Sequence, residues 1–204
     1  RIQEIVLEQN ARFEKTYADL LRELRKHNIH FVNEEQLTPE QAEFAERFFH
    51  KEVRTRLMPL IMSKDKKLPN LTDDAIYFAI QLRNSETDKK RYALLEIPPA
   101  NILPRFIRLP DRNGIKYVIF LDDIIRLGLK EIFYILQFDE LTAYTIKLTK
   151  DAELDIADDI SESYIDKLSK SLQQRRKGTP VRFVYDRNMP PELLKILTKK
   201  LDLG

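Results

Sequence analysis

Apolar side chains recur along residues 2 to about 26 at a spacing typical of one face of an α-helix, and the other positions are mostly Glu, Lys, Arg and Asn. At 1.5 Å rise per residue, the predicted helix is roughly 40 Å long. No later segment predicts a helix of matching length, so we expect residues 1–28 to be helical but only loosely docked. The stripe, close to a heptad seam, runs through Ile2, Val6, Gln9, Phe13, Tyr17, Leu20 and Leu24.

A second helix is predicted after a short extended segment at residues 29–32. Its start is marked by Thr38 as N-cap, Pro39 in the first turn and Gln41 as the third residue of a capping box. Pro59 ends this region, and a polar loop follows at residues 63–74. The apolar face of this helix comprises Phe44, Ala45, Phe48, Phe49 and Val53.

The hydrophobic period then changes from helical spacing to alternation. From Ile76 to Leu82, every second residue is large and apolar, and this alternation predicts a half-buried strand. Asn113-Gly114 is a strong turn signal between two strands. Further strands are predicted at 92–97, 106–109, 117–120, 141–148 and 181–185, and further helices at 122–132, about 158–178 and 191–201. The order predicts an α+β fold, with a mixed β-sheet, flanking helices and one long helix in front.

Composition narrows the class of protein. The 204 residues carry a formal net charge of +2 from 35 basic and 33 acidic residues, which argues against a chain built mainly to coat nucleic acid or an anionic membrane. The absence of cysteine excludes disulfides and thiolate metal sites, and is compatible with a reducing cytoplasm. No apolar run approaches the ~20 residues that span a bilayer. Because Arg1 stands inside the predicted helix without an initiator Met, we expect a longer parent chain.

Several kinds of catalytic site are excluded by the residues themselves. The four glycines, Gly114, Gly128, Gly178 and Gly204, are scattered, whereas a phosphate-cradling loop needs them clustered. The three histidines form no metal-binding pair of the HExxH kind, and capping or solvent-facing roles are favoured for His27, His30 and His50. No nucleophile motif such as GxSxG is present.

Charged clusters at the predicted helix ends allow two interpretations. Asp122-Asp123 could be a metal-binding carboxylate pair, but acidic residues at a helix start complement the helix dipole, and this interpretation is favoured. The same holds for Asp155, Asp158, Asp159 and Glu162. Arg175-Arg176-Lys177 before Gly178 could bind a polyanion, but is also ordinary chemistry for a helix end, which again is favoured.

Three motifs in order resemble one known family. The stretch from Arg91 to Pro110 reads RYALLEIPPANILPRFIRLP, and its prolines fix where two strand-like runs begin and end. The other motifs are Thr149-Lys150-Asp151-Ala152-Glu153 and Pro180-Val181-Arg182-Phe183-Val184-Tyr185 with Met189-Pro190. In this order they resemble the head (middle) domain of bacterial polyphosphate kinases, the histidine-phosphorylated family with phospholipase-D-like C-terminal domains.

The resemblance implies a function for the parent protein. Such enzymes are transferases that move the γ-phosphate of ATP reversibly onto polyphosphate through a phosphohistidine. Their phosphorylated histidine, magnesium site and most nucleotide contacts lie in C-terminal domains. The resemblance therefore implies no catalytic, cofactor-binding or metal-binding residue in this chain, which alone should be inactive.

The resemblance also implies an organisation and partners. Residues 1–28 would be the last helix of an N-terminal helical domain, and 29–204 the head domain, which contributes to a homodimer and to the wall of a polyphosphate tunnel. The large apolar residues Phe44, Phe48 and Phe49 support self-association. Expected partners are a second copy, the other domains of the same chain and polyphosphate, with no nucleic acid. The expected location is the cytoplasm, and peripheral association with the inner membrane is left open.

Lys147 and Lys150 are the candidate contacts for polyphosphate. Both lie at the end of the 141–148 strand, and lysines suit a dense linear anion as point charges. A solvated strand end explains them equally well. If the resemblance misleads, the alternative is a stand-alone α+β domain that binds a protein or RNA partner.

Overall fold

The chain forms two compact units, each built from two separate stretches of sequence. The computed structural model describes residues 2–63, 65, 67–150 and 180–203. The first unit comprises residues 1–55 and 100–128, and the second comprises 56–99 and 129–204. The α+β class is confirmed, but the sequence did not predict that residues 29–204 divide in this way. The predicted domain boundary at residue 28 stays a prediction.

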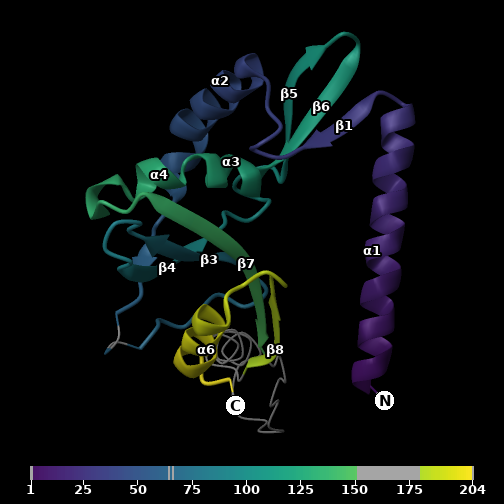
Figure 1. Ribbon diagram of the computed structural model, residues 1–204. Coiled ribbons are helices and arrows are strands. Elements are labelled where there is room, and N and C mark those ends of the chain that lie inside the picture. The colour runs from purple at the N-terminus through teal and green to yellow at the C-terminus, as the bar shows by residue number, and fades with distance from the viewer. Residues whose placement is uncertain (1, 64, 66, 151–179, 204) are drawn as a thin grey trace, which may run out of the picture. The chain divides into compact units, whose positions relative to one another are not determined.

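The first unit contains α1 (Ile2–Lys26) and a three-stranded sheet in the order β1-β6-β5 (Figure 1). β1 (Ile29–Val32) runs parallel to β6 (Ile115–Phe120), and β5 (Phe106–Arg112) is antiparallel to β6. The β5–β6 hairpin turns at Asn113-Gly114, where both residues have positive φ, as the turn signal predicted.

The predicted long helix is confirmed as α1, and its apolar stripe is exposed in the structure. Leu21 and Leu24, next to β1, are half-buried. The exposed large apolar side chains of α1 are Ile5, Val6, Leu7, Phe13, Tyr17 and Leu20. Loose docking of residues 1–28 stays a prediction. No helix in the described part of the chain is long and apolar enough to cross a membrane.

The helix α2 (Pro39–Phe48) begins with the predicted capping box. Thr38 Oγ1 accepts from the Gln41 backbone N–H at 3.4 Å, and Gln41 Oε1 accepts from the Thr38 N–H at 3.2 Å. The amide of buried Gln41 also donates to the Pro110 carbonyl at 3.3 Å, which ties α2 to the irregular end of β5. One side chain thus stabilises two elements of the first unit.

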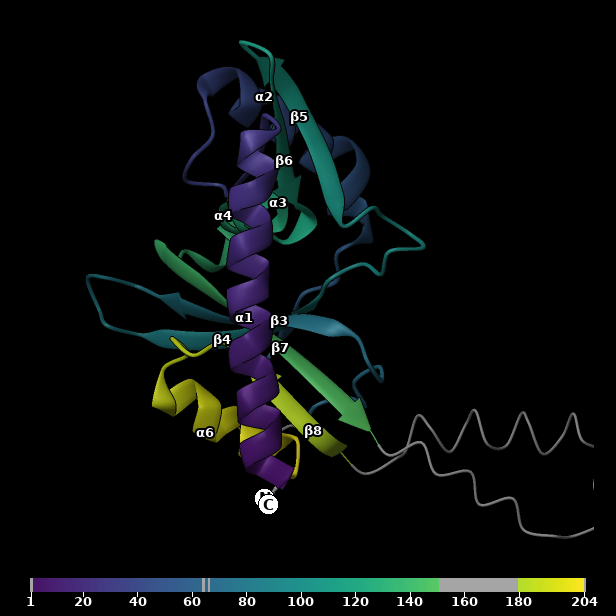
Figure 2. The same ribbon diagram turned by 90° about the vertical axis from the view of Figure 1, so that its right-hand side faces the viewer.

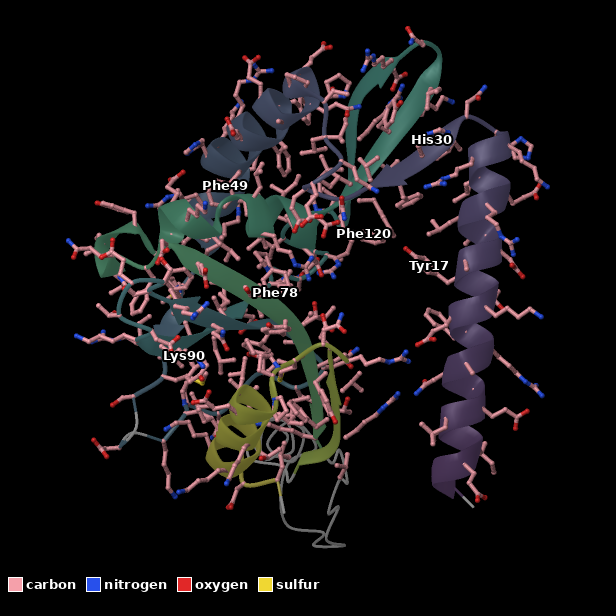
Figure 3. The ribbon with its side chains drawn as sticks, viewed as in Figure 1. Tyr17, His30, Phe49, Phe78, Lys90 and Phe120 are labelled. Atoms are coloured by element: carbon pink, nitrogen blue, oxygen red, sulfur yellow. The ribbon has the colours of Figure 1, made fainter. Side chains whose placement is uncertain are left out.

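α2 continues into a π-helical turn, η1 (Phe49–Val53), and a 3-10 turn, η2 (Arg54–Arg56). Four residues spaced four apart are buried: Gln41, Ala45, Phe49 and Val53. The wider π turn keeps this spacing on the buried side beyond the end of α2. Phe49 is only 2% exposed, so it is a core residue and offers no surface for the self-association predicted around it. Phe49 is labelled in Figure 3.

The helix predicted over 122–132 is wrong in one respect, because it is broken at Gly128. α3 (Leu121–Leu127) ends there, and α4 (Leu129–Ile132) begins after it, in the second unit. A Cβ on Gly128 would lie 2.1 Å from Cζ of Phe49. The Phe49 ring therefore occupies the space that any larger side chain at 128 would need.

The second unit is built on a five-stranded antiparallel sheet in the order β2-β4-β3-β7-β8, with α6 beside it (Figure 2). The 3-10 turn η3 (Tyr134–Leu136) precedes β7. β2 was not predicted, and the helix predicted at about 158–178 lies outside the described residues. The elements are β2 (Leu60–Ile61), β3 (Ile76–Arg83), β4 (Lys90–Glu96), β7 (Glu140–Lys150), β8 (Pro180–Tyr185) and α6 (Pro191–Lys200).

The central strand β3 is buried on both faces, so the prediction of a half-buried strand is wrong. Tyr77 and Ala79 point to the face that α6 covers with Leu193 and Leu197, which are fully buried. Phe78 points to the other face and is also fully buried. The alternation did not reveal this, because the second face is buried by α6, which lies far along the chain.

Candidate phosphate-chain contacts at the end of strand β7

The end of β7 is held by two carboxylates from the loop before β3. Asp74 Oδ1 lies 2.7 Å from Lys147 Nζ, and Asp73 Oδ1 accepts from the Lys150 backbone N–H at 2.8 Å. Lys147 pairs in register with Ile76 of β3 on one side and with Val184 of β8 on the other. The two lysines identified from the sequence therefore lie on one strand, and each is contacted by one of these two adjacent aspartates.

The side chains of Lys147 and Lys150 nevertheless point to opposite faces of the sheet. Successive residues of a strand alternate between faces, and along β7 Ile146, Leu148 and Lys150 are buried while Lys147 is not. Lys150 is 6% exposed and lies on the face that α6 covers, whereas the Lys147 side chain is 39% exposed. The structure does not bring the two ammonium groups together on one surface.

The loop that carries Asp73 and Asp74 is fixed to the sheet by a polar network. Tyr77 Oη donates to Glu96 Oε2 at 2.7 Å and accepts from the Thr72 backbone N–H at 2.9 Å. Burial is the main reason that the pKa of Tyr77 is raised, so its hydroxyl remains protonated and able to donate. The carboxylates beside Lys147 and Lys150 are thus held on an ordered segment.

One basic residue near Lys147 was missed by sequence reasoning. Arg182 lies on β8 opposite Thr149, and its neighbour Val184 lies opposite Lys147. The side chain of Arg182 is exposed. Its place in the Pro180–Tyr185 motif could have identified it. Arg182 stands two positions before Val184 in a predicted strand, so the two side chains share one face.

The acidic pair at the start of α3 is satisfied by arginines. Arg105 Nη2 lies 2.8 Å from Asp122 Oδ1, and Arg126 Nη1 lies 2.6 Å from Asp123 Oδ1. The pKa of Asp123 is raised to about 6, mainly by burial; the Arg126 guanidinium opposes this shift, and the Glu34 and Asp122 carboxylates add to it. Both carboxylates lie in the first turn of α3. Among the described residues, no group of three His, Cys, Asp or Glu could hold a metal ion.

Each of the three histidines has contacts of its own. His27, after the end of α1, is exposed, with Nε2 3.8 Å from Glu23 Oε1. His30 in β1 meets Tyr117 edge-on, with ring centroids 5.6 Å apart (Figure 3). His50 is exposed on η1 and contacts the Phe49 ring at its edge. His27 and His50 are thus exposed, whereas His30 is half-buried against Tyr117.

The three-stranded sheet carries a cluster of phenylalanines. The Phe106 ring lies 5.2 Å from Phe120 and 6.0 Å from Phe31, and Phe106 is 58% exposed. Interplanar angles of 42–87° show that these rings pack against each other at an angle, as aromatic pairs in a hydrophobic cluster do.

Comparison with known proteins places these features in context. Residues 40–204 match the family model described as the polyphosphate kinase middle domain. The chain is 40% identical over 208 aligned residues to a polyphosphate kinase of Vibrio parahaemolyticus, and 37% identical to that of Escherichia coli strain K12. Each alignment covers all of this chain but only 30% of the relative.

The structural comparison agrees with the sequence comparison. The crystal structure of polyphosphate kinase from Porphyromonas gingivalis superposes with a TM-score of 0.79 at 28% identity. The match covers 100% of this chain and 28% of that one. The chain thus spans less than a third of the length of the curated relatives that it matches.

Proposed function

This chain belongs to the polyphosphate kinase family, and from that premise we propose that the complete protein transfers the γ-phosphate of ATP reversibly onto polyphosphate. The family resemblance drawn from the three motifs is confirmed, and the chain carries the middle domain of this transferase family. The observation that carries the proposal is the match over residues 40–204, because it covers the whole second unit and residues 40–55 and 100–128 of the first.

Within that enzyme we propose that this chain supports catalysis without performing it. ATP, Mg²⁺ and a phosphorylated histidine would be bound or carried by other domains of the complete protein. The contacts of His27 and His30 support structural roles, and Asp122 and Asp123 are engaged by arginines. Use of ATP supports a cytoplasmic location, with peripheral contact to the inner membrane as an additional proposal.

Two supporting roles follow for the middle domain. It would contribute to a homodimer, and it would form part of the wall along which the product chain passes. Lys147 is the better supported of the two predicted polyphosphate contacts, because its ammonium is half-exposed. For Lys150, exposed by 6%, the proposal requires that its buried side chain reach solvent at the end of β7.

The activity of the complete protein tests this proposal. With ATP and Mg²⁺ it should produce acid-insoluble polyphosphate, and with polyphosphate and ADP it should form ATP. Sedimentation should show a dimer. Binding of single-stranded RNA, with no synthesis and no polyphosphate binding, would contradict the proposal and favour the interaction domain.

A further inference from the structure

Register places Lys147 and Arg182 on the same face of the β7–β8 pair. Lys147 is opposite Val184, and Arg182 is the next residue on that side of β8, opposite Thr149. Phe183 and Tyr185 point the other way, where their rings stack at 5.6 Å and Phe183 packs against the apolar cluster under α6. Lys147 and Arg182 are therefore diagonal neighbours, at a separation of roughly 7–8 Å between backbones.

The charges of this pair are available to a ligand. Within the described part of the chain, no carboxylate pairs with Arg182, whose side chain is exposed. Lys147 pairs with Asp74, but the Asp74 side chain is 70% exposed and such surface pairs stabilise a protein little. An anion with several charges can replace Asp74 at small cost.

We propose that Lys147 and Arg182 form a binding strip for a linear phosphate chain at the β8 end of the five-stranded sheet. This inference rests on the proposed function, and it replaces the pairing of Lys147 with Lys150 by a pair that shares one surface. No function was assigned to Arg182 by sequence reasoning, and the strip would be one segment of the product path.

The two side chains supply different contacts to such a chain. The guanidinium of Arg182 can hold two oxygens of one phosphate at once, whereas the Lys147 ammonium acts as a point charge on the next phosphate. β8 is an edge strand among the described residues, so its outward backbone N–H groups can donate to the same anion. β8 itself places Val184 opposite Lys147 and carries no acidic residue, and Asp186 follows the strand, where its backbone N–H donates to the Thr145 carbonyl at 2.9 Å.

Binding of an end-labelled long-chain polyphosphate to the complete protein, followed by fluorescence anisotropy, tests the strip. We expect Lys147→Gln with Arg182→Gln to weaken binding by about tenfold. The slope of log affinity against log salt should become shallower by about one to two units, since up to two phosphate contacts are lost. Arg182→Lys should restore part of the affinity.

Asp74→Asn is a variant that should strengthen binding of polyphosphate, whereas the Lys147 and Arg182 variant should weaken it. Asp74 has φ of 59°, a left-handed conformation that asparagine adopts readily, so the fold should be preserved. Removing this carboxylate frees Lys147, and affinity for polyphosphate should rise severalfold. A purely structural role for the strip would not produce a gain of binding.

The matched control removes two charges at other positions of the second unit. Lys89 lies in the β3–β4 hairpin, at the opposite end of β3 from Lys147, and Lys195 lies on the exposed side of α6. Lys89→Gln with Lys195→Gln should leave affinity within about twofold of the unchanged protein. If both double variants lose affinity equally, the loss is a general effect of charge and the inference is wrong.

The outcomes separate the strip from the proposed function. If the unchanged protein synthesises and binds polyphosphate while the Lys147/Arg182 variant behaves identically, the strip is wrong and the proposed function stands. If the unchanged protein neither binds nor makes polyphosphate, the proposed function itself fails. Loss of product length together with loss of binding supports both.

Discussion

Replacing Phe78 with alanine should destabilise the second unit by about 3–5 kcal/mol. Phe78 is fully buried in the central strand β3, between β4 and β7 (Figure 3). The truncation removes a large apolar side chain from the packed core and leaves a cavity. β3 cannot move to close it, because the strand is hydrogen-bonded to a neighbour on each side. Because domains are stable by only about 5–15 kcal/mol, this change alone should bring the unit near unfolding.

Urea denaturation, with hydrogen exchange of β3 and β4 amides, measures this loss. Phe106→Ala is the matched control, because the same side chain is 58% exposed in the three-stranded sheet. It should cost less than about 1 kcal/mol. Equal losses for the two variants would contradict the assignment of Phe78 to the core.

The second large effect is expected at Gly128. Gly128→Ala would place a methyl group 2.1 Å from Cζ of Phe49, and the ring is only 2% exposed, so it cannot swing into solvent. We expect destabilisation at the upper end of about 1–3 kcal/mol, measured by thermal or urea unfolding. The φ of −85° at Gly128 is open to any residue, so the cost arises from packing and not from backbone strain.

A double-mutant cycle isolates this contact. Phe49→Leu shortens the side chain that meets position 128, so Gly128→Ala should be less harmful on that background, with a coupling of about 1 kcal/mol or more. Gly114→Ala is the contrasting control, because nothing lies within 4 Å and only its φ of 75° disfavours alanine. Additive losses for Gly128 and Phe49 would show that the two residues do not compete for space.

Local signals in the sequence predicted much of the secondary structure. The Thr38 capping box, the Asn113-Gly114 turn and the stripe of α1 depend on residues close in the chain, so their pattern suffices. The parallel pairing of β1 with β6 brings together segments more than 80 residues apart, and no local pattern encodes it. The requirement for glycine at position 128 likewise depends on Phe49, which lies in a helical segment far along the chain.

The candidate contacts show the same limit. Alternation along residues 141–148 correctly separated Lys147 from Ile146 and Leu148, but continuing the strand to residue 150 places Lys150 on the buried face. Arg182 becomes relevant only once β8 is known to pair with β7 in this register. Sequence reasoning therefore found one residue of the strip and missed its neighbour.

Synthesis of polyphosphate by residues 1–204 alone, beside the complete protein, tests the central claim most directly. The claim is that this chain is a folded middle domain that supports phosphoryl transfer carried out elsewhere in the protein. With ATP and Mg²⁺, the complete protein should accumulate acid-insoluble polyphosphate, whereas residues 1–204 should give a folded spectrum by circular dichroism and no product. Synthesis by residues 1–204, or none by the complete protein, would contradict the claim.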